Sequence, residues 1–307
     1  MHTRTPLVSI LLLFLIANFP AIAPAETAPA ARAHRLWEQL DRRKLKLKSK
    51  AALVVDRFCN TLYQSNADEV MPIASVTKLM TAMVVLDAKL PMDEKIEITN
   101  ADRDMIRLTG SRLRVGARLT RQALLDLALM ASENRAAAAL GRAFPGGREA
   151  FVRAMNAKAR ELGMHHSRFA DPAGLDAANV STASELSRMV FAAMHYREIR
   201  EATTRTQHEV RPFKGRGPLR YVNTNRLLRN DNWDIQISKT GYINEAGRCL
   251  VMHTEFNGTP TVVVLLNSFG KLTPFGDANR VRKWIEKGVA GGRQQNALKA
   301  KRTAAAG

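Results

Sequence analysis

Near both ends this chain has short β-rich hydrophobic runs, of which the run at 233–241 alternates with polar residues, and the middle of the chain follows a helical spacing. Alternation predicts strands, because successive side chains of a strand point to opposite faces of a sheet. The Asn257-Gly258 dipeptide marks the turn of a β-hairpin. Strands are expected over five β-rich runs, at 51–55, 61–65, 233–241, 247–254 and 259–266.

The middle of the chain has the hydrophobic spacing of helices. Thr182 and Glu185 are placed as in a capping box, which predicts the start of a helix. Strands at both ends and helices between them predict an α+β fold, in which both chain ends form one antiparallel sheet and the helical block packs on it. Helices are expected at 75–86, 120–130, an alanine-rich stretch ending at 144, 149–162, 182–195 and 274–289.

The first 25 residues differ from the rest of the chain. Arg4 precedes an apolar run over 6–20, and Ala23-Pro24-Ala25 offers small residues for cleavage. This pattern predicts a cleavable signal peptide over 1–25, with an uncleaved membrane anchor as the alternative. We therefore expect an exported, periplasmic protein.

The composition is globular, with 307 residues, 46% hydrophobic and 24% charged, and the net charge is +19. Basic residues gather in segments 26–50 and 290–307, which we expect to be flexible arms around a folded catalytic domain at 51–289. No nucleic-acid recognition module is visible. The expected electrostatic partner is therefore an acidic polymer or a membrane surface of the cell envelope.

The cysteine and histidine content gives little sign of a disulfide bond or a metal site. Cys59 and Cys249 allow a single disulfide, and two unpaired thiols are favoured over it. The seven histidines have no zinc-binding spacing, so no metal ligand is assigned.

A candidate nucleophile stands at the start of the first expected helix. Residues i and i+3 share a helix face, so the hydroxyl of Ser75 and the amine of Lys78 can point into one cleft. The lysine can then take the proton of the serine. Ser268 and Lys271 have the same spacing, but they follow a strand and precede a loop, so we discard this second pair.

Two further motifs support the first pair. Ser132-Glu133-Asn134 lies at the end of a buried helix, and Lys239-Thr240-Gly241 ends an alternating strand. Together with Ser75-x-x-Lys78 they resemble the SxxK, SxN and KTG motifs of penicillin-binding proteins and class A β-lactamases. The resemblance implies a β-lactamase/D,D-peptidase-like fold. Glu133 replaces the aspartate usual in the second motif, which leaves its local role open.

The motifs assign a role to each site residue. Ser75 would attack the carbonyl next to a D-alanine, and a neutral Lys78 would accept its proton, which requires burial or a nearby cation such as Lys239. The alternation places Lys239 on the side of Ile235 and Ile237, facing the helices. The candidates are Ser75, Lys78 and Ser132 for catalysis and Asn134, Lys239, Thr240, Gly241 and Tyr242 for substrate binding.

The roles of the binding residues are more specific. Ser132 would relay a proton to the leaving amine and Asn134 would bind a substrate amide. Thr240 would hold a carboxylate or backbone group of the substrate, while Gly241 would let the substrate approach the backbone closely. The resemblance also implies an oxyanion held by the backbone N–H groups of Ser75 and Tyr242.

The resemblance narrows over longer segments, at 129–135, 162–164, 171–175 and 238–252. They are similar to low-molecular-mass D,D-peptidases, in particular to the D-alanyl-D-alanine endopeptidase branch of penicillin-binding protein 7 type. This similarity covers 51–289 and implies cleavage of the D-alanyl to meso-diaminopimelyl cross-links of peptidoglycan. It also implies covalent inhibition by β-lactams and no cofactor.

Three alternatives remain open. A D,D-carboxypeptidase would use the same residues, but its relatives commonly carry a second domain and an anchor, and only eighteen residues follow Val289 here. A class A β-lactamase needs a deacylating carboxylate, and Glu149 and Glu161 lie in the wrong context for it. A non-catalytic peptidoglycan-binding or penicillin-sensing protein would not need the nucleophile and its base.

Overall fold

A five-stranded antiparallel sheet forms the centre of the molecule in the computed structural model, which describes residues 40–256 and 258–304. The expected signal peptide lies outside the described residues. The strand order β2-β1-β11-β10-β9 joins the two chain ends, so the predicted α+β fold is confirmed. The strands are β1 Ser49–Asp56, β2 Thr61–Ser65, β9 Asp234–Ile243, β10 Gly247–Phe256 and β11 Thr259–Ser268.

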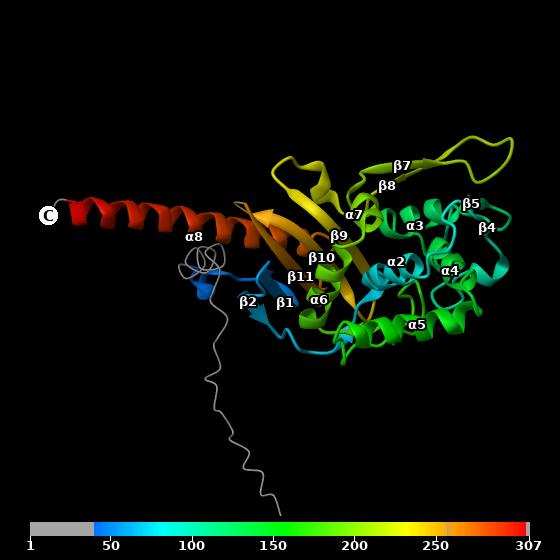
Figure 1. The fold of residues 1–307 in the computed structure, drawn as a ribbon, viewed down its shortest axis with the longest axis horizontal. Coiled ribbons are helices and arrows are strands. Elements are labelled where there is room, and N and C mark those ends of the chain that lie inside the picture. Colours follow the sequence, from blue (N-terminus) through cyan, green and yellow to red (C-terminus); the bar gives the residue numbers. More distant parts are fainter. Residues whose placement is uncertain (1–39, 257, 305–307) are drawn as a thin grey trace, which may run out of the picture.

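Helices cover both faces of this sheet (Figure 1). Helix α8, Thr273–Ala304, packs on one face against alternate residues such as Val54 and Leu265. The intervening residues, such as Leu53 and Val264, face the helical block on the other side. Because both faces are covered, the middle of β11 is a continuous hydrophobic run rather than an alternating one.

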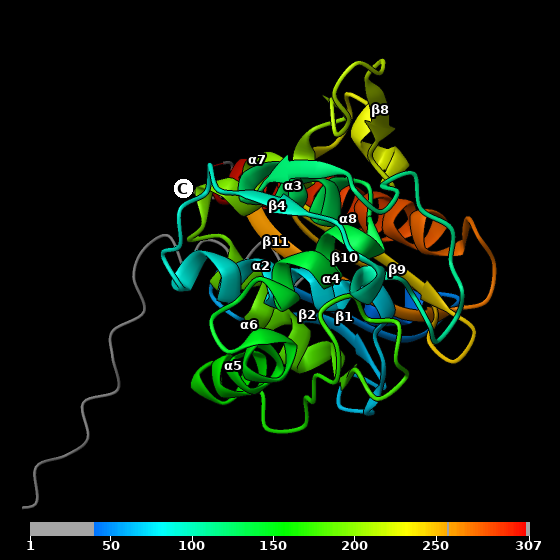
Figure 2. The same cartoon turned by 90° about the vertical axis from the view of Figure 1, so that its right-hand side faces the viewer.

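The helical block is built around α2, whose residues are buried from Lys78 to Val85. Figure 2 shows this helix between the sheet and the outer helices, with α8 behind. A helix enclosed on all sides needs apolar residues around its whole circumference, which α2 has. The block consists of α2 Lys78–Asp87, α3 Arg121–Met130, α4 Asn134–Arg142, α5 Gly147–Glu161, α6 Ala183–Ala193 and α7 Arg197–Thr204.

Several short elements were not expected from the sequence. They contain two to four residues each, too few to show a hydrophobic period. The two-residue strands β3 Met71–Pro72 and β6 Val180–Ser181 pair beside the nucleophile. The others are β4 Lys95–Glu97, β5 Arg118–Thr120, β7 Gln207–Val210, β8 Leu219–Val222 and the 3-10 helices η1 Arg42–Lys44, η2 Ala74–Thr77, η3 Asn100–Asp102 and η4 Arg226–Arg229.

The described parts of the two basic segments, 40–50 and 290–304, have more structure than the sequence predicted. Leu40 and Leu45 are buried in the same cluster as the apolar face of α8, and Trp284 Nε1 donates to the Asp41 carbonyl at 3.0 Å. Among the described residues, packing therefore includes Leu40 and Leu45, which precede 51, and α8 continues beyond 289 to Ala304. No helix among the described residues is both long and apolar enough to cross a membrane.

Two local expectations are settled by the contacts. Thr182 caps α6 by accepting from the Glu185 N–H at 3.1 Å, as predicted. The Glu185 carboxylate does not complete the capping box in return, because it accepts from the His166 N–H and the Ser167 hydroxyl instead. Cys59 is exposed, Cys249 is buried, and both thiols are free.

Candidate active site

Ser75 lies on a tight 3-10 turn that leads directly into α2. Its Oγ is 2.7 Å from the Nζ of Lys78, the first residue of α2. The preceding residue, Ala74, has a φ of 48°, a left-handed conformation that costs a non-glycine residue about 1 kcal/mol or more. Backbone strain of this kind is typical of a functional turn that the surrounding structure holds in place.

Lys78 is completely buried, and its amine has three acceptors. Nζ donates to Ser75 Oγ, to Asn134 Oδ1 at 2.8 Å and to the Ala173 carbonyl at 2.6 Å. Burial lowers the pKa of Lys78 to about 7, although the carboxylates of Asp171, Glu133 and Asp104 oppose this shift. A lysine whose pKa is lowered toward neutrality has a neutral fraction that can accept the serine proton.

Lys239 is the second buried lysine of the site. Its Nζ donates to Ser132 Oγ at 2.9 Å and to the Thr240 carbonyl at 2.8 Å. Burial, and then the charge of Lys78, holds the pKa of Lys239 well below its ordinary value. The sequence suggested Lys239 as a cation that lowers the pKa of Lys78, whereas burial is the main cause in both lysines.

The side on which Lys239 points was predicted only in part. Ile237 shares the helical side of the sheet with Lys239, but Ile235 packs on the α8 side. The register of β9 against β10 shifts between His253 and Thr254, so the alternation breaks between the two isoleucines. A β-bulge of this kind cannot be read from an alternating pattern.

Ser132 and Asn134 come from the connection between α3 and α4. Ser132 also adopts a left-handed φ, of 57°, and Asn134 is the first residue of α4. Asn134 accepts from Lys78 and donates through Nδ2 to Thr109 Oγ1 at 3.0 Å. The role of Glu133, left open by the sequence, is to cap α4 by accepting from the Arg135 N–H at 3.3 Å.

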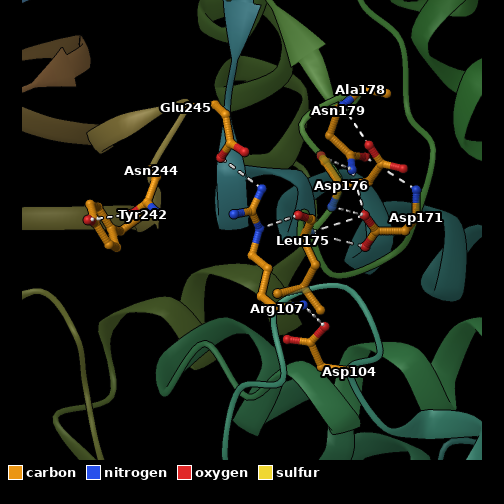
Figure 3. Close-up of polar contacts among 10 residues, drawn as sticks. All are labelled: Asp104, Arg107, Asp171, Leu175, Asp176, Ala178, Asn179, Tyr242, Asn244 and Glu245. Carbon is orange, nitrogen blue, oxygen red and sulfur yellow. Dashed lines mark hydrogen bonds and ion pairs between the residues drawn. The ribbon is translucent and has the colours of Figure 1, made fainter.

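The loop that carries Ala173 was quoted for its resemblance but received no role from the sequence. The carboxylate of Asp171 accepts from the N–H groups of Ala173 at 2.6 Å and Gly174 at 2.7 Å, and from Asn179 Nδ2 at 2.6 Å. Figure 3 shows Asp171 within this loop. These bonds fix the carbonyl that binds Lys78. A Cβ on Gly174 would lie 2.0 Å from the Ala74 carbonyl oxygen, so only glycine allows this approach.

Strand β9 forms the opposite side of the site. A Cβ on Gly241 would lie 2.9 Å from the Ile73 carbonyl oxygen and 3.0 Å from the Ser75 nitrogen. Gly241 therefore allows the strand to approach the nucleophile turn, a reason that differs from the substrate approach expected from the sequence. Thr240 Oγ1 and Thr224 Oγ1 are 2.7 Å apart, and Tyr242 is 48% exposed.

A cavity of about 310 Å³ lies between these two sides. Its lining includes six predicted residues, Ser75, Ser132, Asn134, Thr240, Gly241 and Tyr242, while Lys78 and Lys239 lie buried beneath them. The lining residues that the sequence did not suggest are Thr224, Arg226, Arg248, Cys249, Lys271, Leu272, Pro274 and Phe275. Among the described residues, no group of three or more His, Cys, Asp or Glu is placed to hold a metal ion.

The discarded serine and lysine pair is divided between two places. Ser268 is buried at the end of β11, where its Oγ lies 2.7 Å from Ser49 Oγ. Lys271 is exposed and contributes to the rim of the cavity. The pair is therefore not a second catalytic pair, although its lysine belongs to the site.

A serine and lysine pair on a buried central helix, facing a Lys-Thr-Gly strand at the edge of an antiparallel sheet, defines the class of serine D,D-peptidases with a β-lactamase-like fold. A family model described as D-alanyl-D-alanine carboxypeptidase, peptidase S11, matches residues 38–270. The chain belongs to this family.

Relatives within the family are similar over most of the chain. A D-alanyl-D-alanine endopeptidase of Pseudomonas aeruginosa is 46% identical over 286 residues, which are 93% of this chain and 90% of that protein. One of Escherichia coli is 44% identical over 280 residues, 91% of this chain and 87% of that protein. The structure of penicillin-binding protein D2 of Listeria monocytogenes in its cefotaxime-bound form is 29% identical, covers 78% of this chain and 98% of its own, and superposes with a TM-score of 0.67.

Proposed function

We propose that this chain is a serine D,D-endopeptidase that hydrolyses the D-alanyl to meso-diaminopimelyl cross-links of peptidoglycan through an acyl-enzyme on Ser75. The observation that carries the proposal is the 2.7 Å contact of Ser75 Oγ with a buried Lys78 whose pKa is about 7. A nucleophilic hydroxyl needs a base of this kind within hydrogen-bond reach. The names of the two bacterial relatives support the choice of a cross-link as substrate.

Acylation begins with the attack of Ser75 Oγ on the carbonyl carbon of the D-alanyl residue. Neutral Lys78 takes the hydroxyl proton as the C–O bond forms. The oxyanion is held by the backbone N–H groups of Ser75 and Tyr242. The close approach of β9 to the nucleophile turn at Gly241, the residue before Tyr242, supports this assignment. Asn134 binds an amide of the acyl half of the substrate.

The leaving amine departs on the side of Ser132. The Ser132 hydroxyl donates a proton to this nitrogen as the C–N bond breaks, and Lys239 restores the proton through its 2.9 Å contact. Thr240 holds the carboxylate of the residue that leaves. Before the second step, Lys78 releases to solvent the proton that it took from Ser75, and Lys239 takes one up. Water then attacks the ester carbonyl as neutral Lys78 takes a proton from it, and Lys78 gives this proton to Ser75 Oγ as the ester C–O bond breaks, which regenerates Ser75.

The same site accounts for inhibition by β-lactams, which acylate a serine without releasing a leaving group from the cavity. A relative of the same fold has a structure in its cefotaxime-bound form, which supports this part of the proposal. We expect Ser75 to be the residue that a β-lactam acylates.

The surroundings of the enzyme are also part of the proposal. A signal peptide over 1–25 would export the chain to the periplasm, where cross-links are found. Exposed cations at 42, 43, 44, 46 and 48 lie on the segment that packs on α8, which supports electrostatic association with an anionic envelope surface. Salt should release the protein from isolated envelopes, and retention at 1 M salt would contradict this association.

A comparison of two substrates tests the proposed function. Purified protein is incubated with a cross-linked muropeptide dimer and with a pentapeptide monomer, and the products are separated by chromatography. We expect monomers from the dimer, and no product from either substrate with Ser75→Ala. Release of free D-alanine alone would indicate a carboxypeptidase, rapid multiple-turnover hydrolysis of penicillin a β-lactamase, and no product from wild type a non-catalytic protein.

A further inference from the structure

Three cations line the cavity, and no acidic residue of the lining balances their charge. Arg226, Arg248 and Lys271 line it, and the lining contains no Asp or Glu. The described residues provide no ion pair for any of the three. Arg226 and Lys271 are exposed and Arg248 is half-buried. Solvent-accessible cations that line one cavity without a carboxylate partner indicate an anionic ligand group.

The three cations come from elements that are held in place. The guanidinium carbon of Arg248 lies 3.7 Å from the centre of the Tyr242 ring, so the side chain is stacked. Arg226 begins η4, which is capped by the buried Asn225 side chain accepting from the Leu227 N–H at 3.0 Å. Lys271 lies in a short turn between β11 and α8.

This turn is closed by Thr273. Its Oγ1 accepts from the Gly270 N–H at 3.2 Å, and its own N–H donates to the Gly270 carbonyl at 3.1 Å. Lys271 therefore stands on a defined rim rather than on a long loop. A charge with a fixed backbone loses less freedom on binding a ligand, which favours a specific contact.

Arg226 is connected to the side of the cavity on which the leaving group departs. In the proposed reaction the Ser132 hydroxyl protonates the leaving amine, and Ser132 contacts Lys239 on β9. Thr240, the next residue, touches Thr224, two residues before Arg226. In the proposed reaction the leaving half therefore lies beside Thr240, in a cavity that Arg226, Arg248 and Lys271 also line.

The two possible substrates differ in the charge of their leaving groups. A pentapeptide releases D-alanine, which has a single carboxylate. A cross-link releases a second stem peptide, which carries the carboxylate beside the cleaved amide and further carboxylates on its own residues. Thr240 and Arg248, which is stacked on Tyr242 two residues further along β9, are assigned to the first carboxylate, which leaves Arg226 and Lys271 for the others.

We propose that Arg226 and Lys271 are specificity residues that bind the additional carboxylates of a cross-linked leaving peptide. This inference rests on the proposed endopeptidase function and names the part of the cavity that selects the cross-link. Both residues touch the substrate without taking part in the chemical step. Their effect is therefore expected in KM for the dimer rather than in kcat.

A double variant, Arg226→Gln with Lys271→Gln, tests the inference. The matched control is Arg229→Gln with Lys283→Gln, which removes one exposed cation of η4 and one of α8 outside the cavity. Each variant is assayed with the dimer, with the pentapeptide and with a dimer whose leaving-half carboxylates are amidated. Fluorescent penicillin labelling verifies that each variant is folded.

The double variant should lower the ratio of kcat/KM for the dimer to kcat/KM for the pentapeptide about tenfold, mainly through KM. The control should leave this ratio within about twofold, as surface charges outside a site usually do. Amidation should lower dimer cleavage by wild type and have less effect on the double variant. Such a difference arises only if the protein charges and the substrate carboxylates interact.

Two outcomes would overturn the inference. One is an equal loss on dimer and pentapeptide, because Arg226 and Lys271 would then serve a carboxylate common to both. The other is an unchanged ratio in the double variant. If wild type cleaves dimers and the double variant keeps the wild-type ratio of kcat/KM values, only this inference is contradicted. If wild type releases only D-alanine, the proposed function is contradicted.

Discussion

The two walls of the cavity are built in different ways. The helical wall, Ser75, Lys78, Ser132 and Asn134, has polar side chains that bind one another or buried partners. The strand wall is more exposed and carries cations for which residues 40–256 and 258–304 provide no carboxylate partner. It consists of Thr240, Tyr242, Arg226, Arg248 and Lys271. The polar groups of the helical wall have partners within the protein, whereas the cations of the strand wall are available to bind a ligand.

This difference separates chemistry from recognition. Around Lys78 on the helical wall and the buried Lys239 of β9, contacts of 2.6 to 2.9 Å hold the groups of the proposed proton transfers in place before a substrate arrives. Such preorganisation avoids rearrangement during the reaction. On the strand wall, the cations can form ion pairs with carboxylates of a substrate and so contribute to its binding. Changes in the helical wall should therefore affect the rate of the chemical step, and changes in the strand wall the choice of substrate.

The largest effect is expected from Ser75→Ala. Without the nucleophile, labelling by a fluorescent penicillin should fall roughly 10⁴-fold or more. The control is Ser268→Ala, the serine of the discarded pair, which should cost about 1 kcal/mol of stability and keep labelling. Gel fluorescence after a fixed labelling time measures both. Labelling that survives in Ser75→Ala, or disappears in Ser268→Ala, would show that the nucleophile has been assigned to the wrong residue.

The base of the helical wall should titrate near neutrality. Lys78 must be neutral to accept a proton, and its pKa is about 7. The second-order rate of penicillin acylation should therefore rise as pH increases through about 7 and level off above it. Lys78→Arg should lower this rate roughly 10³-fold, because a guanidinium stays protonated. Lys287→Arg, on the exposed side of α8, should follow the wild-type profile, and a flat wild-type profile would exclude Lys78 as the base.

Gly241 is the residue at which the two walls meet. In Gly241→Ala the new Cβ would lie 2.9 Å from the Ile73 carbonyl oxygen, so β9 and the nucleophile turn must separate. Displacement by a few tenths of an ångström to 1 Å should lower acylation about 100-fold, with about 1 to 3 kcal/mol lost from stability. Gly217→Ala is the control, because nothing lies within 4 Å of its Cβ position. Equal acylation rates in the two variants would mean that the approach of the walls is unimportant.

The sequence predicted the helical wall better than the strand wall, for a physical reason. Ser75 and Lys78 are related by one helical turn, and Ser132 and Asn134 by a short connection, so local spacing brings each pair together. The sheet made from both chain ends was also predictable, because its strands are β-rich runs and the Asn257-Gly258 dipeptide marks a hairpin turn between two of them. These features depend on residues close in sequence or on a strong hydrophobic period.

The remaining features depend on contacts between distant segments. The break in alternation that separates Ile235 from Ile237 arises from a bulge against β10. Arg226 reaches the cavity from a four-residue 3-10 helix, and Lys271 from a turn that the sequence analysis had set aside. The order of Leu40 and Leu45 comes from packing on α8, at the other end of the chain. Single-chain patterns do not carry such information.

The smallest expected effect concerns Arg107, which ties the supports of the two walls together. Its Nε donates to the Leu175 carbonyl at 2.6 Å, in the loop that orients Ala173 toward Lys78. Its Nη2 pairs with Glu245 at 2.8 Å, in the turn between β9 and β10 (Figure 3). Arg107→Met should lower penicillin acylation about tenfold, the size of one lost charge-assisted hydrogen bond of about 1.5 kcal/mol.

Two companion variants separate the contacts of Arg107. Glu245→Gln removes only the exposed ion pair, so it should lower acylation less than twofold, in line with the small energy of surface pairs. Arg103→Met removes an exposed arginine of the same segment and serves as the control. If Arg107→Met behaves like Arg103→Met, the Ala173 loop holds its carbonyl without help and the walls are independent. If Glu245→Gln matches Arg107→Met, the turn after β9, rather than the Ala173 loop, transmits the effect to Ser75.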